Sequence, residues 1–222
     1  SLLAIRAKLL AAMGDLVSLN TLLNATPGRS RDQELVRVET EARFLSNDNA
    51  RACALAGGQI RDDKVPYWQK AFLFCQALAG EHGKASLGIS VMREAGEKDE
   101  VFFALIESLG TSTPAILDSL SDPTPLHLAM ARVVKAKLPD DVILSNRPGV
   151  LRTIAISPNA PIGLRLEAAE RAESAGALAV DSLRQIYSSI SFSEQDLANP
   201  LSRAETEGGP MTRALLYYTS LN

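Results

Sequence analysis

The chain has 222 residues, of which 46% are hydrophobic and 22% charged, and its formal net charge is −3 at pH 7. This composition is ordinary for a folded globular protein and allows a sizeable core. The chain has no basic excess to neutralise phosphates, so we expect no nucleic acid as a main partner. No apolar run reaches the roughly 18 residues of a membrane-spanning helix, so we also expect no direct membrane span in this segment.

The first residues, SLLAIRAKLLAAMGD, predict an amphipathic helix and not a leader peptide, because they contain no cleavage site. The chain also does not begin with methionine. We therefore expect residues 1–222 to form a single helical-repeat domain that is a segment of a longer protein.

Apolar residues recur at intervals of three and four along the chain, as in Leu35, Val38, Ala42 and Leu45. This is the period of a helix with one buried face, and no convincing alternating strand of six residues is present. Pro66 precedes a Leu- and Ala-rich run and stands where a helix would begin. The sequence therefore predicts an all-α protein.

Short breaks divide these helical segments at regular intervals. Successive breaks lie 30 to 36 residues apart and fall near Gly14, Asn47, Gly80, Gly110, Asn146, Gly176 and Gly208. Looser breaks fall between them, which is typical of stacked helix hairpins. We predict that helices pair at each of these breaks. The predicted fold is a right-handed α-solenoid of about seven stacked helix hairpins.

Capping residues agree with several of these boundaries. Asp15 follows the first break and can accept hydrogen bonds from the free N–H groups of the next helix. Ser30 with Gln33, and Ser193 with Asp196, fit the spacing of a capping box. These positions predict helix starts.

Two segments resemble tetratricopeptide repeats, which are helix hairpins of about 34 residues. The segments GDLVSLNTLLNATP, residues 14–27, and GEHGKASLGISVM, residues 80–92, resemble the second helix of such a repeat. Pro27 matches its closing proline, and Ala85 its small residue where paired helices touch. The Trp, Leu-Gly and Tyr pattern of the first helix is missing. The resemblance implies an α-solenoid that binds other proteins. A third segment, LRLEAAERAESAGAL at 164–178, is similar to uncharacterised helical repeat proteins of alphaproteobacterial envelopes, and this resemblance implies no activity.

The stretch GEHGKAS, residues 80–86, superficially resembles a phosphate-binding loop. That motif needs Gly at position 78, Ser or Thr at 85, and a preceding strand. The chain has Leu78, Ala85 and a preceding helical pattern. We therefore predict a turn between two helices, with Lys84 in solvent and no nucleotide bound.

Other candidate catalytic groups lack partners in the sequence. His82 and His127 are the only histidines, and neither lies at metal-ligand spacing from another His or Cys. Glu167, Glu170 and Glu173 recur every three residues, a spacing more typical of a solvated helix face than of paired catalytic carboxylates. We expect no catalytic residue, no metal and no cofactor.

Two adjacent aromatic pairs are candidate interface residues: Tyr67 with Trp68, and Tyr217 with Tyr218. Neighbours in a helix point in different directions, so at most one of each pair can lie fully in the core. Exposed Trp and Tyr frequently anchor protein interfaces. For Trp68, packing between successive hairpins is the stronger alternative.

The two cysteines, Cys53 and Cys75, each lie 11 residues from Lys64, at the centre of a predicted turn. Equal offsets place residues opposite each other in an antiparallel hairpin. Helix axes about 8–10 Å apart bring inward-facing Cα atoms to about 4–6 Å, within disulfide range. The alternative is a pair of small buried thiols. A disulfide would indicate an oxidising compartment such as the bacterial periplasm, and free thiols the cytoplasm.

These observations favour a non-catalytic protein–protein interaction scaffold or adaptor, in a bacterial envelope assembly, with one or more protein partners. One alternative is the α-superhelical platform of an enzyme, such as a periplasmic cell-wall lytic enzyme, whose catalytic domain lies outside this segment. Another is a small-molecule sensor that holds its ligand between helices.

Overall fold

The computed structural model describes residues 1–60, 65–111 and 113–221, and it is all-α: these residues contain helices and connecting segments but no β-strand. The predicted all-α class is therefore confirmed, and the right-handed solenoid stays a prediction. None of the helices in these ranges has both the length and the apolar character needed to cross a membrane.

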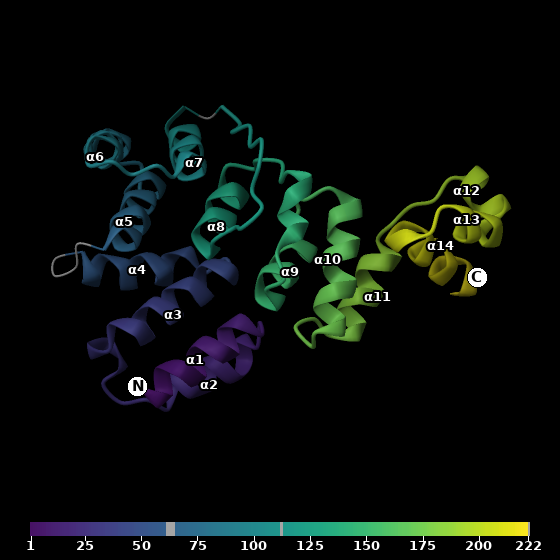
Figure 1. Ribbon diagram of the computed structural model, residues 1–222, viewed down its shortest axis with the longest axis horizontal. Coiled ribbons are helices and arrows are strands. Elements are labelled where there is room, and N and C mark those ends of the chain that lie inside the picture. The colour runs from purple at the N-terminus through teal and green to yellow at the C-terminus, as the bar shows by residue number, and fades with distance from the viewer. Residues whose placement is uncertain (61–64, 112, 222) are drawn as a thin grey trace.

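The helices are numbered in chain order in Figure 1. Their bounds are α1 Leu2–Ala12, α2 Leu16–Asn24, η1 Arg29–Arg31 (a 3-10 turn), α3 Gln33–Leu45, α4 Asn49–Gln59, α5 Pro66–Leu78, α6 His82–Glu94, α7 Glu100–Thr111, α8 Pro125–Val133, η2 Asp140–Leu144 (also 3-10), α9 Pro148–Ala155, α10 Ile162–Ser174, α11 Val180–Ser188, α12 Glu194–Ala198, α13 Pro200–Thr206 and α14 Gly209–Leu221.

Five of the predicted breaks are tight turns between contacting helices. Each has a residue with positive φ: Gly14 (74°), Asn47 (60°), Gly80 (79°), Gly176 (74°) and Gly208 (61°). A left-handed residue ends a helix and satisfies its last carbonyls, and Gly and Asn adopt this conformation most readily. These turns pair α1 with α2, α3 with α4, α5 with α6, α10 with α11, and α13 with α14.

The other two breaks are not tight turns. Gly110 lies within α7, and a non-helical segment at 113–124 separates α7 from α8, although these two helices still pack against each other. Asn146 lies between η2 and α9. Prolines explain the first departure, because Pro114 and Pro123 disfavour helix in the residues before them. Asp141 then accepts hydrogen bonds from the Leu120 N–H, at 2.8 Å, and from the Ser119 hydroxyl, which hold this segment in place.

The predicted caps are confirmed where the structure describes them. Asp15 accepts from the Ser18 N–H at 2.9 Å, and Ser193 and Asp196 form a reciprocal capping box at the start of α12. The Ser30 side chain lies outside the described part of the structure, and the N-cap of α3 is Asp32.

The chain turns back on itself in its first two thirds, so helices distant in sequence lie together. Figure 1 shows α1 and α3 facing α8 and α9, and α3 packs against both α8 and α9 while α1 packs against α3 and α9. These contacts go beyond the neighbour-to-neighbour packing of a simple hairpin stack. The main core contains four fully buried phenylalanines of α3, α5 and α7: Phe44, Phe74, Phe102 and Phe103.

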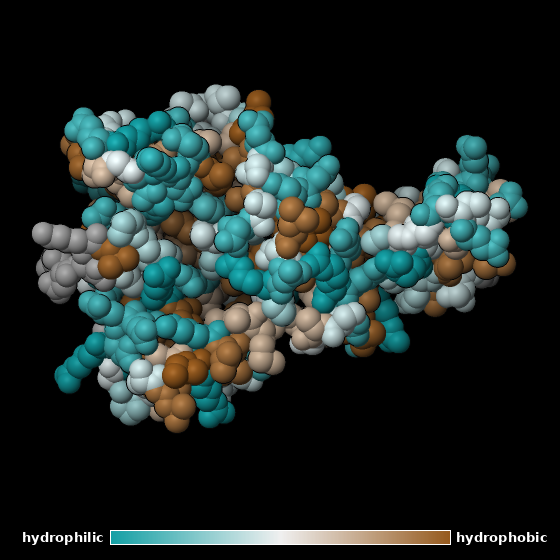
Figure 2. All heavy atoms as spheres, viewed as in Figure 1, coloured by the Kyte–Doolittle hydropathy of each residue, from teal (hydrophilic) through white to brown (hydrophobic). Residues whose placement is uncertain are grey.

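The last three helices form a narrower arm at the C-terminal end, visible on the right of Figures 1 and 2. Within it α14 packs against α10 and α11, while α12 and α13 lie on the far side of α14.

Candidate functional site

A cavity of about 500 Å³ lies where α1 and α3 face the beginnings of α5, α8 and α9. We call it the central cavity. Its walls come from segments that are more than 100 residues apart, since Lys8 and Ala11 of α1 lie across from Gly149 and Val150 of α9. The cavity therefore exists only because the chain turns back on itself.

Two glycines allow α1 to approach α9 closely enough to form this wall. A Cβ atom at Gly149 would lie 2.9 Å from the carbonyl oxygen of Ala11, and one at Gly14 would lie 3.1 Å from the Cα atom of Gly149. The first distance is shorter than real Cβ contacts allow, and the obstacle is backbone, which cannot rotate away. The contact between the α1–α2 turn and α9 is therefore made by backbone and needs glycine.

The floor of the central cavity is apolar and buried. It includes Val38 and Leu45 of α3, Trp68 of α5 and Val150 of α9, and Trp68 is only 2% exposed. Trp68 is also the only tryptophan in the chain. Its burial agrees with packing between helices, yet it borders the cavity, so its role at an interface is still a prediction.

The rim carries charged side chains that already have partners. The Lys8 ammonium lies 2.8 Å from the Glu34 carboxylate, and the Arg37 guanidinium lies 3.0 Å from the Glu41 carboxylate. On the opposite side, Arg147 lies 3.0 Å from Asp122. The rim is thus polar, and its positive and negative charges balance each other in pairs. Such a rim can orient a bound molecule through hydrogen bonds but creates no strong net electrostatic field.

Tyr67 lies beside this rim and carries an unsatisfied polar atom. Its hydroxyl oxygen is buried and has no hydrogen-bond partner in the described structure. The Arg37 guanidinium stacks over its ring, with 4.4 Å between the guanidinium carbon and the ring centroid. Burial raises the pKa of the phenol well above its ordinary value, and the Glu41 carboxylate raises it further. Tyr67 therefore stays a neutral hydroxyl, able to donate a hydrogen bond.

The predicted approach of Cys53 and Cys75 is confirmed. Their sulfur atoms lie at bonding distance, 1.99 Å apart, and their Cα atoms are 5.5 Å apart. The bond joins α4 to α5, the helix that carries Tyr67 and Trp68. The intervening turn around Lys64 includes residues 61–64, which lie outside the described part of the structure.

His127 has structural partners that the sequence did not reveal. Its Nδ1 atom accepts from the Thr124 N–H at 3.4 Å, which assigns the ring proton to Nε2, and Nε2 lies 3.0 Å from the Asp99 carboxylate. The Lys70 ammonium lies 2.8 Å from the same carboxylate. Burial raises the pKa of Asp99, but the hydrogen bonds from His127 and Lys70 outweigh it and hold that pKa well below its ordinary value. This trio ties α5, α7 and α8 together.

The stretch GEHGKAS is the turn between α5 and α6, as predicted. Gly80 occupies the left-handed position, His82 begins α6 and is exposed, and Lys84 is exposed and pairs with Glu81 at 3.0 Å. Nucleotide binding itself stays a negative prediction. Within the described ranges, no group of three or more His, Cys, Asp or Glu side chains is placed to hold a metal ion.

The second aromatic pair packs within the molecule. The Tyr217 ring lies 5.5 Å from that of Tyr187, and the Tyr218 ring lies 5.6 Å from that of Phe192. Both are half-buried contacts of α14, so any use of Tyr217 or Tyr218 at an interface stays a prediction.

The row of glutamates is only partly a solvated face. Glu167 is paired along the helix, with its carboxylate 3.8 Å from Arg171. Glu170 instead accepts the Tyr187 hydroxyl at 2.6 Å and two hydrogen bonds from Arg213, at 2.9 and 2.5 Å. Glu170 therefore joins α10 to α11 and α14.

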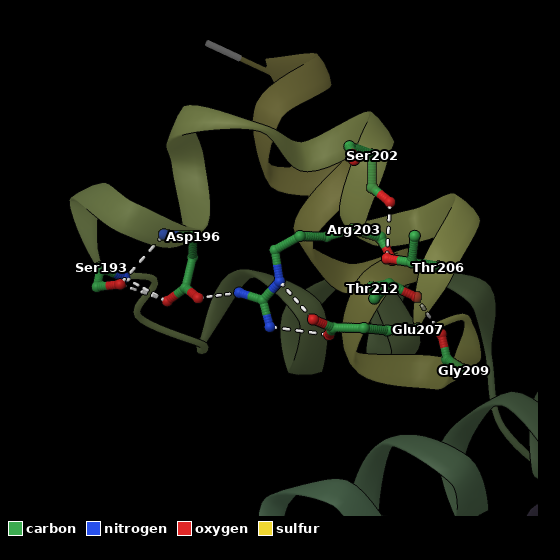
Figure 3. Close-up of polar contacts among 8 residues, drawn as sticks. All are labelled: Ser193, Asp196, Ser202, Arg203, Thr206, Glu207, Gly209 and Thr212. Atoms are coloured by element: carbon green, nitrogen blue, oxygen red, sulfur yellow. Dashed lines mark hydrogen bonds and ion pairs between the residues drawn. The ribbon is translucent and has the colours of Figure 1, made fainter.

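A second polar cluster holds the far side of the arm. Figure 3 shows Asp196 between Ser193 and Arg203, with Arg203 reaching across to Glu207. The guanidinium of Arg203 donates to both carboxylate oxygens of Glu207, at 3.0 and 2.9 Å. These contacts fix α12 against α13, and each of these charged side chains has a partner within the cluster.

The described residues form an all-α protein with a cavity of ligand size between helices that are distant in sequence. A scan of protein-family models, a search of curated proteins and a search of solved structures each found no match to this chain. The resemblance to tetratricopeptide repeats is therefore not supported by any family model.

Proposed function

We propose that this protein is a non-catalytic binding scaffold, and that it holds a short segment of a partner protein in the central cavity. The observation that carries the proposal is the cavity itself, which runs from a buried apolar floor to an exposed polar rim. One apolar side chain of the partner fills the space beside Trp68. The partner backbone lies along the rim, within reach of Gln33 and Arg37.

The wider architecture in this proposal is a helical-repeat stack of right-handed twist, modified by the contact between α1 and α9. Such stacks commonly bind partners on an inner surface. The compartment that fits best is oxidising, such as a bacterial periplasm, because the Cys53–Cys75 pair lies at disulfide distance.

A small-molecule sensor is a second candidate, favoured by the size of the cavity. A volume of about 500 Å³ is within the range of small-molecule sites, which also combine an apolar lining with a few polar groups. The unsatisfied hydroxyl of Tyr67 is close to this lining, since Arg37 and Glu41 border both.

The test begins with a selection of 12-residue peptides displayed on phage and bound to the 222-residue chain. Selected peptides should change the fluorescence of Trp68, because that side chain borders the cavity. Gln33→Phe narrows the rim and should weaken their binding about tenfold, a loss of about 1.4 kcal/mol.

The matched control is Gln185→Phe, which adds the same bulk to an exposed position on α11 that does not line the central cavity. It should leave binding unchanged. A failure to select any peptide, or equal binding by both variants, would count against the proposal. Binding of small apolar molecules alone, blocked by Gln33→Phe, would favour the sensor.

A further inference from the structure

The outward face of α1 carries a stripe of exposed apolar side chains. Their exposed fractions are 84% for Leu2, 56% for Ile5, 59% for Leu9 and 54% for Met13. Figure 2 shows the corresponding hydrophobic area over α1 at the lower left of the molecule. Isolated exposed apolar residues are common, but a continuous stripe along one helix marks an interaction surface.

The opposite face of α1 is also apolar and already has its partners. Ala4 and Ala7 are fully buried in a small core with Leu19, Leu23 and Leu35 of α2 and α3. The helix is therefore apolar on both sides and not amphipathic as the sequence suggested. A helix of that kind is normally covered on both sides, so the stripe lacks a partner in this structure.

The stripe has the spacing of a coiled-coil seam. Leu2, Ile5, Leu9 and Ala12 are separated by three, four and three residues, which corresponds to positions a, d, a and d of a heptad. In this register Arg6 lies at position e. A seam of this kind accepts another helix along three turns of α1, about 17 Å.

The charges beside the seam determine which helix fits. Lys8, at position g, is neutralised by Glu34 at 2.8 Å. Arg6 is exposed and has no carboxylate partner in the described part of the structure. Positions e and g set the choice of partner in coiled coils, so Arg6 favours an acidic residue on the incoming helix.

A second copy of the chain does not supply that residue. Antiparallel pairing of two α1 helices places Arg6 opposite Arg6, and these like charges disfavour it. Parallel pairing places Arg6 opposite position g of the preceding heptad, which is Ser1 and not a carboxylate.

We propose that the outer face of α1 docks an amphipathic helix of another protein, with an apolar heptad seam flanked by glutamate or aspartate. This surface adjoins the central cavity only at Ala12 and Lys8, which also line the cavity, and the proposal does not depend on the function proposed above.

The test uses two synthetic 21-residue helical peptides with leucine at positions a and d. One carries glutamate at e and g, and the other carries lysine there. Binding to the full 222-residue chain is measured by fluorescence anisotropy at low salt. The glutamate peptide should bind saturably, and the lysine peptide about tenfold more weakly or not at all.

Variants identify the surface. Arg6→Glu should reverse the preference between the two peptides, and Leu9→Asp should abolish binding of both. Leu9 is exposed, so its replacement should leave the fold intact, which circular dichroism checks. Val91→Asp is the matched control, since Val91 is equally exposed but lies on α6. Gln33→Phe should also have no effect.

Three results would overturn the proposal. Equal binding of both peptides would mean that charge does not select the partner. A concentration-dependent dimer of the chain that Leu9→Asp abolishes in analytical ultracentrifugation would make a second copy the occupant. Binding to phosphatidylglycerol vesicles that needs Leu9, with no binding of either peptide, would make it a membrane contact.

Discussion

The central region and the C-terminal arm are held together by different forces. The central region, formed by α3, α5, α7, α8 and α9, surrounds fully buried phenylalanines, with the rings of Phe44 and Phe74 5.8 Å apart. In the arm, α12 and α13 contain no buried residue, although the structure describes both in full, and only α14 buries apolar side chains, Ala214 and Leu215. Polar contacts such as those of Glu170 and Arg203 add to these. Stability should therefore concentrate in the region that forms the central cavity.

The largest difference should appear when one apolar side chain is removed from each region. Phe74→Ala empties a fully buried site and should destabilise the protein by about 4 kcal/mol, from lost burial and the cavity left behind. Leu201→Ala, at a position of α13 that is 70% exposed, should cost no more than about 0.5 kcal/mol. Urea unfolding curves measure both. Similar losses would show that the arm is as tightly packed as the central region.

The disulfide offers the next largest effect, and a local one. Its loop spans 22 residues, for which the chain-entropy model gives about 3 kcal/mol. Replacing both Cys53 and Cys75 by alanine should therefore lower the free energy of unfolding by up to that amount. Hydrogen exchange should show lost protection in α4 and α5, with α14 unchanged. Two reactive thiols in the unfolded, unreduced wild-type protein would contradict the bond, and with it the main support for an oxidising compartment.

Asp99 should produce a smaller effect that depends on pH. Its pKa in the folded state lies below the ordinary 3.8, so the stabilisation is complete above that value and is lost as pH falls below it. Asp99→Asn should cost about 2 kcal/mol at pH 7, between the values for exposed and fully buried pairs. The variant should also lose stability less steeply than the wild type below pH 4.

The control for this experiment is Asp118→Asn, an exposed carboxylate in the segment between α7 and α8. It should change neither the stability at pH 7 nor its dependence on acid. If Asp99→Asn follows the wild-type curve down to pH 2, the pairing with Lys70 and His127 does not stabilise the core.

Features that depend on nearby residues could be predicted from the sequence. The left-handed turns at Gly14, Asn47 and Gly80 follow from the conformational freedom of Gly and Asn, and the caps at Asp15 and Ser193 follow from hydrogen bonds within one helical turn. The same regularity misled at Gly110, because spacing alone does not show that the prolines after it delay the next helix until Pro125.

The central cavity could not be predicted, because it depends on contacts between residues far apart in the chain. The carbonyl oxygen of Ala11 packs closely against the backbone of Gly149, although the two residues are far apart in the chain. Nothing in the sequence around either residue indicates this contact. Asp99 and His127 are separated by 28 residues and meet only because α7 and α8 pack together. The cysteines were an exception, since a hairpin places equal offsets opposite each other.

The smallest effect should come from the ion pair that joins the arm to α10. Arg213→Met removes both hydrogen bonds to Glu170 but leaves the one from the Tyr187 hydroxyl, so the Glu170 carboxylate is not left without a partner. Because the Arg213 side chain is about half exposed, the loss should be no more than about 1 kcal/mol. Hydrogen exchange should speed up in α14, while the unfolding midpoint of the central region stays the same.

Arg203→Met is the matched control: its partners lie within the arm, so contacts of α14 with α10 should persist. A shift of the whole unfolding transition by Arg213→Met, comparable to that of Phe74→Ala, would mean that the arm and the central region unfold as one unit.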